Sequence, residues 1–296
     1  MNILSFGSLN LDKVYQVEHF VRPGETVSSL SMAEYCGGKG LNQSIAIARA
    51  GGHVWHAGCV GRADGAPLLK ALADSGVDTS LVRQLDCPTG HAIIQVDRDG
   101  QNCILLYGGA NQQITTGQID QALDHFRPGD LLVLQNEISQ LPYLMGAARA
   151  AGLTIVLNPS PMNASILTLP LRHVSYFLLN EVEARELCGQ ECRDDLLPER
   201  LLERFPDSHI VLTLGARGSI YQDAHQRIEQ PAFKVDAVDT TAAGDTFTGF
   251  FLASIAQAVP VAEALKTASK AAAISVTRSG AAPSIPTKTE VFASPL

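Results

Sequence analysis

A run of small residues leads into a predicted helix near the carboxyl end of the chain, and one carboxylate stands at that junction. The segment 239–247 reads Asp-Thr-Thr-Ala-Ala-Gly-Asp-Thr-Phe. The small side chains of Ala242, Ala243 and Gly244 allow main-chain N–H groups at a helix start to approach an anion closely. Asp245 could accept the proton of a hydroxyl that attacks a phosphoryl group. A lone aspartate in a first turn more often stabilises the helix dipole, but the small-residue run favours the catalytic interpretation.

A second glycine-rich turn, Gly-Gly-Lys-Gly-Leu-Asn-Gln at 37–43, precedes another amphipathic segment. Glycines such as Gly38 let the backbone approach a ligand, and Lys39 and Asn42 supply hydrogen-bond donors. The turn is not a Walker A loop, which needs four residues between its Gly and Gly-Lys and then Ser or Thr. Taken alone, it is explained more simply as a helix-capping loop.

Carboxylate and amide side chains follow two of the apolar segments that predict strands. Asn10 and Asp12 come after the segment 3–6 and alternate with apolar residues, so that both side chains point the same way. Glu137 follows the segment 131–134. A carboxylate beside an amide suits the vicinal hydroxyls of a sugar, although each residue alone could be a turn or helix-capping residue.

Polar residues also follow two later predicted strands. Asn180 and Glu183 come after the segment 176–179, and Thr213 comes after 210–212. Asn180 and Glu183 could organise a hydrated Mg²⁺ and nucleotide phosphates, or they could be a helix N-cap and its first-turn glutamate. Like the residues of the preceding paragraph, they lie just beyond carboxyl ends of strands, where open parallel sheets bind ligands. This shared placement favours a binding site.

The elements that must position these residues alternate along the chain, which predicts a mainly parallel sheet covered by helices on both faces. Apolar runs predict strands at 3–6, 131–134, 154–157, 176–179 and 209–214. Amphipathic patterns predict helices at 40–50, 66–75, 116–125, 141–151, 181–188, 196–204, 244–258 and 261–277. We therefore expect one doubly wound α/β domain over residues 1–296.

Two segments interrupt this alternation. Segment 13–35 carries strand-like residues broken at 22–24, and segment 88–107 predicts a hairpin of strands 92–96 and 102–107. Both predict antiparallel β-structure inserted beside the main sheet. Such an insertion could be a lid that excludes water from a reaction, or a peripheral sheet without mobility.

The composition narrows the class of protein. The chain has 296 residues, 46% of them hydrophobic and 18% charged, which is typical of a globular protein with a large core. Its net charge of −8 and the lack of a basic run argue against nucleic acid as a partner. The sequence shows no membrane span and no secretory leader at its start, and its six cysteines are dispersed without zinc spacing. We expect a cytoplasmic protein with reduced thiols.

With these residues in view, the chain resembles the ribokinase family of carbohydrate kinases, also called the PfkB family, over nearly its whole length. The turn at 37–40 is similar to the first signature of that family, and 239–245 is similar to the second, highly specific one. Further similar segments, closest to the ribokinases within the family, are 7–12, 23–26, 37–43, 108–111, 213–218 and 283–284.

The resemblance implies an ATP-dependent sugar kinase that acts with Mg²⁺, with Asp245 as base and an anion hole at Ala242, Ala243 and Gly244. It implies that the sugar, D-ribose first of all, is held by Asn10, Asp12, Gly38, Lys39, Asn42 and Glu137. The residues expected at ATP are Asn180, Glu183, Thr213, Gly215, Arg217, Gly218, Gly244 and, near the adenine, Ser269. A monovalent cation, usually K⁺, would be held largely by backbone carbonyls at Asp239, Thr241, Ser275, Arg278, Gly280 and Ser284. The lid segments would clasp a second subunit in a homodimer.

Departures from the family pattern leave the identity of the preferred sugar undetermined. Ala242 stands where glycine is more usual, which leaves the backbone amide in place. Leu11, Leu41 and Ser44 replace smaller residues near the sugar pocket, and one altered apolar contact changes discrimination by only ~1–3 kcal/mol. The alternatives are 2-deoxyribose, another pentose, a ketohexose or a nucleoside. A non-catalytic sugar-sensing module is a further alternative. A Rossmann-type dehydrogenase is disfavoured, because this chain lacks the Gly-x-Gly-x-x-Gly turn that such an enzyme needs after its first strand.

Overall fold

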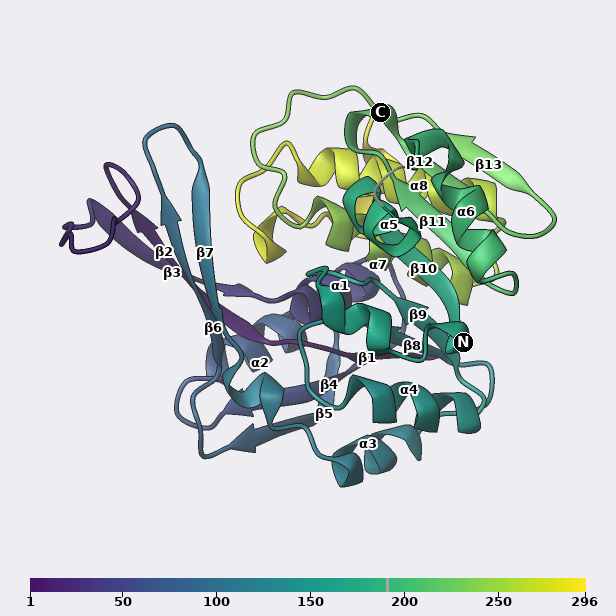
Figure 1. The fold of residues 1–296 in the computed structure, drawn as a ribbon, viewed down its shortest axis with the longest axis horizontal. Coiled ribbons are helices and arrows are strands. Elements are labelled where there is room, and N and C mark those ends of the chain that lie inside the picture. Colours follow the sequence, from purple (N-terminus) through teal and green to yellow (C-terminus); the bar gives the residue numbers. More distant parts are fainter. Residues whose placement is uncertain (190–191) are drawn as a thin grey trace.

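The computed structural model describes residues 1–189 and 192–296 and contains two β-sheets (Figure 1). In this part of the chain the main sheet has nine strands in the order β13-β12-β11-β10-β9-β8-β1-β4-β5. Its parallel strands are β1 (Ile3–Phe6), β4 (Val54–Gly61), β5 (Asp78–Leu85), β8 (Leu131–Leu134), β9 (Thr154–Leu157), β10 (Val174–Asn180) and β11 (His209–Thr213). At one end of the sheet β12 (Ser219–Gln222) pairs antiparallel with β11, and the edge strand β13 (Arg227–Gln230) pairs antiparallel with β12.

Helices cover both faces of this sheet because its central strands are apolar on both sides. In β1, Ile3 enters one core, while Leu4 and Phe6 enter the other. The first core is closed by α1 (Lys39–Arg49), α2 (Ala66–Asp74), α7 (Ala243–Ala256) and α8 (Val261–Ser275). The second is closed by α3 (Thr116–Leu123), α4 (Leu141–Ala150), α5 (Glu181–Cys188) and α6 (Leu197–Arg204). The predicted doubly wound fold is confirmed.

Several strands were not predicted from the sequence. β4 carries two glycines and the fully buried His56, so its apolar run is interrupted. β5 lies at the sheet edge, and its residues are exposed or half-buried, so it lacks a continuous apolar run. β12 and β13 are short antiparallel additions, and the short terminal helix α9 (Lys288–Ala293) also went unpredicted.

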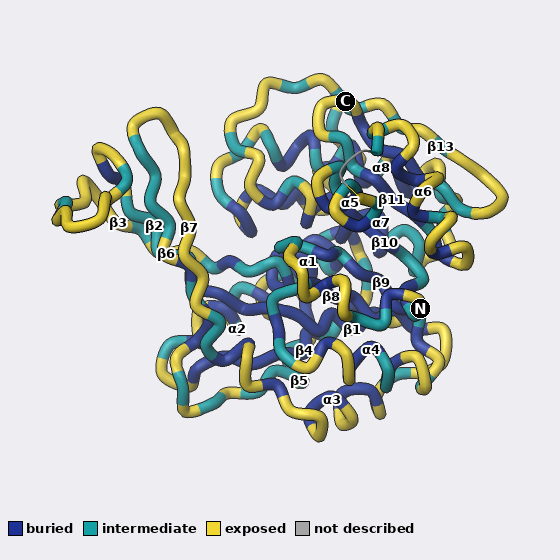
Figure 2. Tube along the Cα trace, in the orientation of Figure 1, coloured by how far each residue is buried: buried dark blue, intermediate teal, exposed yellow. Residues whose placement is uncertain are grey.

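A small sheet of order β3-β2-β6-β7 projects from the main body (Figure 1). Its strands are β2 (Asn10–Gln16), β3 (Ser31–Gly37), β6 (Gly90–Val96) and β7 (Asn102–Tyr107). β6 and β7 form the hairpin expected at 92–96 and 102–107, while β2 runs parallel to β6 and antiparallel to β3. Every residue of the edge strand β7 is exposed (Figure 2). Only residues 7–9 separate strand β2 from the main-sheet strand β1, so the chain passes directly from one sheet to the other.

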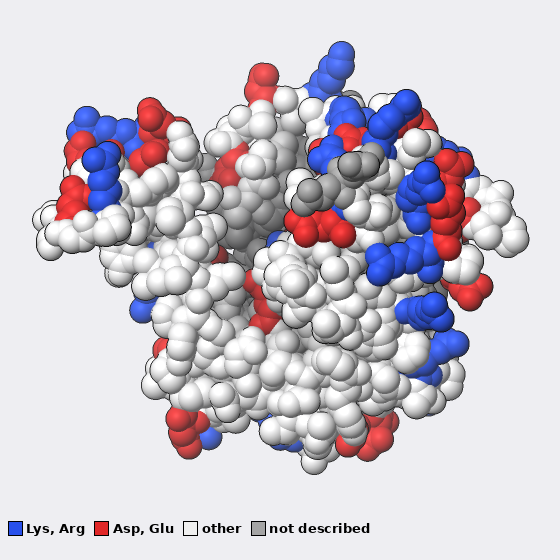
Figure 3. Space-filling model, viewed as in Figure 1, with Lys and Arg blue, Asp and Glu red and all other residues white. Residues whose placement is uncertain are grey.

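The surface and the helices add two findings. Figure 3 shows a hollow between the small sheet and the body, and charged side chains at the tip of the small sheet. Among the helices of residues 1–189 and 192–296, none combines the length and the apolar character that a bilayer crossing requires.

Candidate active site

The site lies where the strand order reverses around β1. The chain leaves β1 toward β4 and β5 on one side, and β8 begins the series β8–β11 on the other. Open α/β sheets bind ligands at the carboxyl ends of strands beside such a reversal. Helix α1 starts at this edge because Gly40 packs directly on the loop after β1: a Cβ at Gly40 would lie 2.4 Å from the backbone nitrogen of Ser8.

Asp245 lies in the first turn of α7, and helix α1 donates a hydrogen bond to each of its two carboxylate oxygens. Asn42 Nδ2 donates to Asp245 Oδ2 at 3.1 Å, and Gln43 Nε2 donates to Asp245 Oδ1 at 2.9 Å. The Asp245 side chain is buried, yet it lines a cavity of about 230 Å³. A carboxylate fixed by two N–H donors and open to a cavity can accept a proton from a bound hydroxyl.

The loop before Asp245 has an unusual backbone. Ala242, the residue ahead of α7, has φ 60° and ψ 10°, in the left-handed region that favours glycine. The cavity is lined by Ala242, Ala243 and Gly244, as an anion hole requires. The N–H of Ala243, however, donates to the Thr240 carbonyl at 3.2 Å, so this amide would have to exchange that bond to bind an anion.

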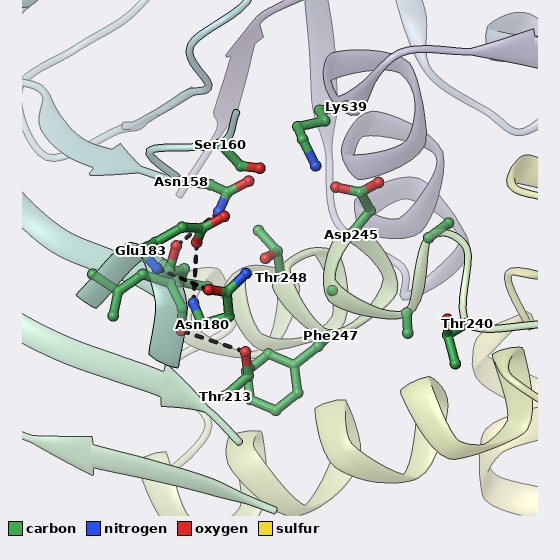
Figure 4. Close-up of a pocket in the computed structure, with 15 residues that line it drawn as sticks. Lys39, Asn158, Ser160, Asn180, Glu183, Thr213, Thr240, Asp245, Phe247 and Thr248 are labelled. Carbon is green, nitrogen blue, oxygen red and sulfur yellow. Dashed lines mark hydrogen bonds between the residues drawn. The ribbon is translucent and has the colours of Figure 1, made fainter. Parts of the chain in front are cut away.

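Lys39 brings a positive charge to the same cavity. Its ammonium group and the Asp245 carboxylate point into a shared space (Figure 4). Burial lowers the pKa of Lys39, but the carboxylates of Asp245, Glu137 and Glu183 outweigh it, and the pKa is raised. Lys39 therefore stays charged and can meet an anionic phosphate in a protein whose net charge is −8.

Asn180 and Glu183 lie across the cavity from Asp245 and form a capping box at the start of α5. Asn180 Oδ1 accepts from the N–H groups of Val182 and Glu183, both at 2.9 Å, and Glu183 Oε2 accepts from Asn180 N–H at 3.0 Å. The N-cap reading of these residues is thus correct, and they line the cavity as well. A Mg²⁺ ion that keeps its water shell would fit this pair through those waters.

A larger cavity of about 570 Å³ adjoins the first, and both are lined by Thr213, Thr240, Ala243, Gly244 and Phe247. The larger one is mostly apolar in its lining, which suits a flat heterocycle. Of the residues expected at ATP, it contains Thr213, Gly215, Gly218, Gly244 and Ser269.

The side chain of Arg217 lies elsewhere. It pairs with Asp194 at 2.7 Å and with Glu181 at 3.5 Å, and the residue is not part of the lining of either cavity. A direct contact between its guanidinium and a nucleotide would require these pairs to break. Its neighbours Gly215, Ala216 and Gly218 do line the cavity.

Of the residues expected at the sugar, only Lys39 lines either of these cavities, and the others lie around the start of α1. Glu137 accepts hydrogen bonds from the Ser8 hydroxyl and from the Lys39 N–H, the latter at 3.1 Å. Burial raises the pKa of Glu137, and burial followed by repulsion from Glu137 raises the pKa of Asp12 to about 7. Asn42 Oδ1 is buried without a hydrogen-bond partner among the described residues, so it offers an acceptor.

Three site residues were missed by the sequence reasoning. Asn111 Nδ2 donates to Asn10 Oδ1 at 2.8 Å, while Asn111 Oδ1 accepts from Leu9 N–H at 3.0 Å. Gln43 and Asn158 bond to each other beside Asp245. Asn158 directly follows β9, so the strand-end rule used for the other residues could have found it.

The expected cation loops, 238–241 and 275–284, lie against each other. Asp239 accepts from Thr241 N–H at 2.8 Å and from Gly280 N–H at 2.9 Å, and the buried hydroxyls of Ser275 and Ser284 are 3.0 Å apart. Arg278 pairs through its side chain with Glu290, so only its backbone could serve a cation. Hydroxyl and main-chain oxygens would have to be the donors to a cation here, because no group of His, Cys, Asp or Glu suited to a metal occurs in the described ranges.

Comparisons with known proteins agree with this geometry. The profile of the pfkB family carbohydrate kinases matches residues 1–288. A ribokinase from Haemophilus influenzae is 36% identical over 294 residues, covering 97% of this chain and 95% of that protein. The Thermotoga maritima ribokinase structure superposes with a TM-score of 0.89 at 32% identity, covering 99% and 98% of the two chains. A Cryptococcus neoformans ribokinase in complex with ADP gives 0.84 at 36% identity, covering 98% of each. The chain belongs to the pfkB family of carbohydrate kinases.

Proposed function

We propose that this ATP-dependent sugar kinase phosphorylates the primary hydroxyl of D-ribose to give ribose 5-phosphate, with Asp245 as the base. The observation that carries the proposal is the position of Asp245. It faces the cavity that adjoins the nucleotide-sized one, and it bonds to Asn42 at the edge where the sugar residues gather. A hydroxyl between those regions would lie next to both the base and the transferred phosphoryl group.

On the sugar side, the residues offer complementary hydrogen-bonding groups. Asn42 Oδ1 would accept from a hydroxyl, since it has no other partner in the described structure. Asn10 has its oxygen occupied by Asn111 Nδ2, so its own Nδ2 would donate to the sugar. Asp12 and Glu137 would accept from vicinal hydroxyls when ionised. The ribokinase names of the relatives support ribose, and Leu11, Leu41 and Ser44 keep 2-deoxyribose as the second candidate.

On the phosphate side, Lys39 and the main chain at 242–244 would receive the charge that develops on the transferred group. Asn180 and Glu183 would hold Mg²⁺ through water, and that ion would neutralise charge on the phosphates. We further propose that Asp239, Thr241, Ser275, Arg278, Gly280 and Ser284 bind K⁺, largely through backbone carbonyls. The ion would stiffen the loop that carries Ala242, because Asp239 already ties that loop to Gly280.

We also propose that residues 1–296 form one kinase domain in which segments 13–35 and 88–107 act as a lid and as the contact of a homodimer. Strand β7 supports this with an exposed apolar run in which Leu105 is 67% exposed and Ile104, Leu106 and Tyr107 about half exposed. Such a run on an unpaired edge strand is unusual for a surface that only meets water.

An ADP-release assay tests the activity. Mg-ATP is combined with D-ribose, 2-deoxyribose, fructose or adenosine, in K⁺ and in Na⁺ alone. We expect the highest kcat/KM with D-ribose and a marked rise with K⁺. A different best sugar would reassign the pocket, equal rates in K⁺ and Na⁺ would refute the cation site, and folded protein that binds ATP without turnover would favour the sensing module.

A further inference from the structure

A chain of side-chain amides lies beside Asp245, and the bond from Gln43 to Asp245 is its only link to which a role was given above. Gln135, directly after β8, donates from Nε2 to Gln43 Oε1 at 2.7 Å. Gln43 donates from Nε2 to Asp245 Oδ1 at 2.9 Å and to Asn158 Oδ1 at 3.1 Å. Asn158 donates from Nδ2 to the Leu178 carbonyl at 2.9 Å. Gln43 is fully buried, and Gln135 is 1% exposed.

The direction of every bond in this chain is fixed by one main-chain atom. The Leu178 carbonyl can only accept, so Asn158 must turn its NH₂ group toward β10 and its oxygen toward Gln43. Gln43 must then present its own NH₂ group to Asn158, and the same NH₂ group meets Asp245. The oxygen of Gln43 is left facing Gln135, which supplies the matching donor.

Gln135 leaves one of its own polar atoms unpaired in this arrangement of the amides. With its NH₂ group turned to Gln43, its Oε1 is buried without a hydrogen-bond partner among the described residues. Leaving a buried oxygen without a hydrogen-bond partner is unfavourable, because the oxygen has lost its contact with water. Turning the Gln135 amide over would bring two oxygens face to face at Gln43. The network therefore accepts one unpaired oxygen in order to keep an N–H donor aimed at Asp245.

We propose that Gln43 is a positioning residue for phosphoryl transfer: it keeps the Asp245 carboxylate turned toward the substrate hydroxyl, in an orientation set by Asn158 and relayed from Leu178. The inference rests on the proposed role of Asp245 as base. An ionised carboxylate only accepts hydrogen bonds, and Gln43 and Asn42 give one N–H to each of its oxygens. A donor amide that cannot turn over limits rotation of the carboxylate that it holds.

The test compares the pH dependence of kcat/KM in Gln43→Glu, Gln43→Met and wild type. In Gln43→Glu two carboxyls would share one site, so the acid limb should move to higher pH by at least about one pH unit. Gln43→Met removes the donor and should lower kcat about 10- to 100-fold, with the KM for the sugar within about threefold of wild type. Gln257→Glu, an exposed residue that bonds to the Gly51 carbonyl, is the matched charge control and should leave the limb in place.

Folding is checked by thermal melting and by calorimetric binding of ADP. If Gln43→Glu does not fold, Asn158→Leu carries the test, because it removes the acceptor that orients Gln43 and leaves Asp245 itself unaltered; an unchanged kcat there would overturn the proposal. An acid limb of Gln43→Glu that coincides with wild type would overturn it as well. Asp245→Asn distinguishes failure of the proposed base from failure of the positioning role. Substantial turnover of Asp245→Asn would refute Asp245 as the base. An inactive Asp245→Asn, together with an acid limb of Gln43→Glu that does not move, would refute only the positioning role of Gln43.

Discussion

Asp12 is expected to destabilise the folded protein at alkaline pH, and replacing it with asparagine should reveal by how much. Burial, and then repulsion from Glu137, raise its pKa from the ordinary 3.8 to about 7. The folded state thus holds a proton on Asp12 that the unfolded chain releases near pH 4. Below about pH 4 Asp12 does not lower the free energy of unfolding, because it is protonated in both states. Between about pH 4 and pH 7 the free energy of unfolding falls as pH rises.

The size of the effect follows from the pKa. Each pKa unit corresponds to ~1.4 kcal/mol, so a rise from 3.8 to about 7 corresponds to about 4 kcal/mol at pH 8. This is an upper bound, because the Asp12 side chain keeps some contact with water. Asparagine resembles the protonated carboxyl in shape. Asp12→Asn should therefore unfold at higher urea than wild type at pH 8, and the two should converge near pH 4.

Urea unfolding of both proteins at pH 4, 6 and 8, without sugar, measures this difference. Asp207→Asn, at an exposed position, serves as the control for loss of one negative charge. A stability difference between Asp12→Asn and wild type that is the same at all three pH values would refute the reasoning. Sugar affinity gives an independent check: if the sugar needs ionised Asp12, the KM of wild type should rise as pH falls below about 7, and Asp12→Asn should lose this dependence.

Four further outcomes are expected. Asp245→Asn should abolish turnover, with sugar affinity in equilibrium binding nearly intact; retention of most of kcat would contradict the base assignment. Ala242→Gly should relieve a left-handed backbone and raise the free energy of unfolding by up to about 1 kcal/mol, which urea unfolding measures against wild type. Gly249→Ala should force α7 off α1, because its Cβ would lie 2.3 Å from that of Ala46; loss of several degrees in Tm together with kcat is expected, and an unchanged Tm would show that the helices adjust freely. Leu105→Glu should convert a dimer into a monomer in sedimentation, and a wild type that is already monomeric would remove the basis for the lid contact.

The fold could be predicted where strands are uniformly apolar and helices strongly periodic. β1 and β8 are such strands, and both were placed at their observed bounds. β4 was missed because its buried face contains His56 and glycine, whose places are set by neighbours far away in the sequence. His56 is buried in the neutral form, since burial lowers its pKa to about 4, and it bonds to Ser44 at 2.8 Å. The local sequence around His56 does not predict its bond to Ser44.

The site divides in the same way. Residues such as Asn180 and Asp245 could be placed from sequence because the end of a strand or the start of a helix fixes where they lie. Which groups they bond to could not be predicted. Arg217 lies in the expected loop, but its side chain turns to Asp194, because an exposed guanidinium follows the nearest carboxylate. The bond between Gln43 and Asp245 joins residues 202 positions apart on two helices, and its direction depends on the Leu178 carbonyl of strand β10.

The arrangement of the small sheet bears on how the site would close. β2 begins with Asn10, and β3 ends at Gly37, with Gly38 alone between it and helix α1, which carries Lys39 and Asn42. A displacement of the small sheet would therefore carry the sugar residues at both strand ends with it. Asn111 opposes such a shift, because its side chain bonds to the Leu9 N–H at 3.0 Å and to Asn10 at 2.8 Å. The pocket would then be expected to close by bending of the sheet beyond Asn10, with the residues beside Asp245 staying fixed to the main sheet.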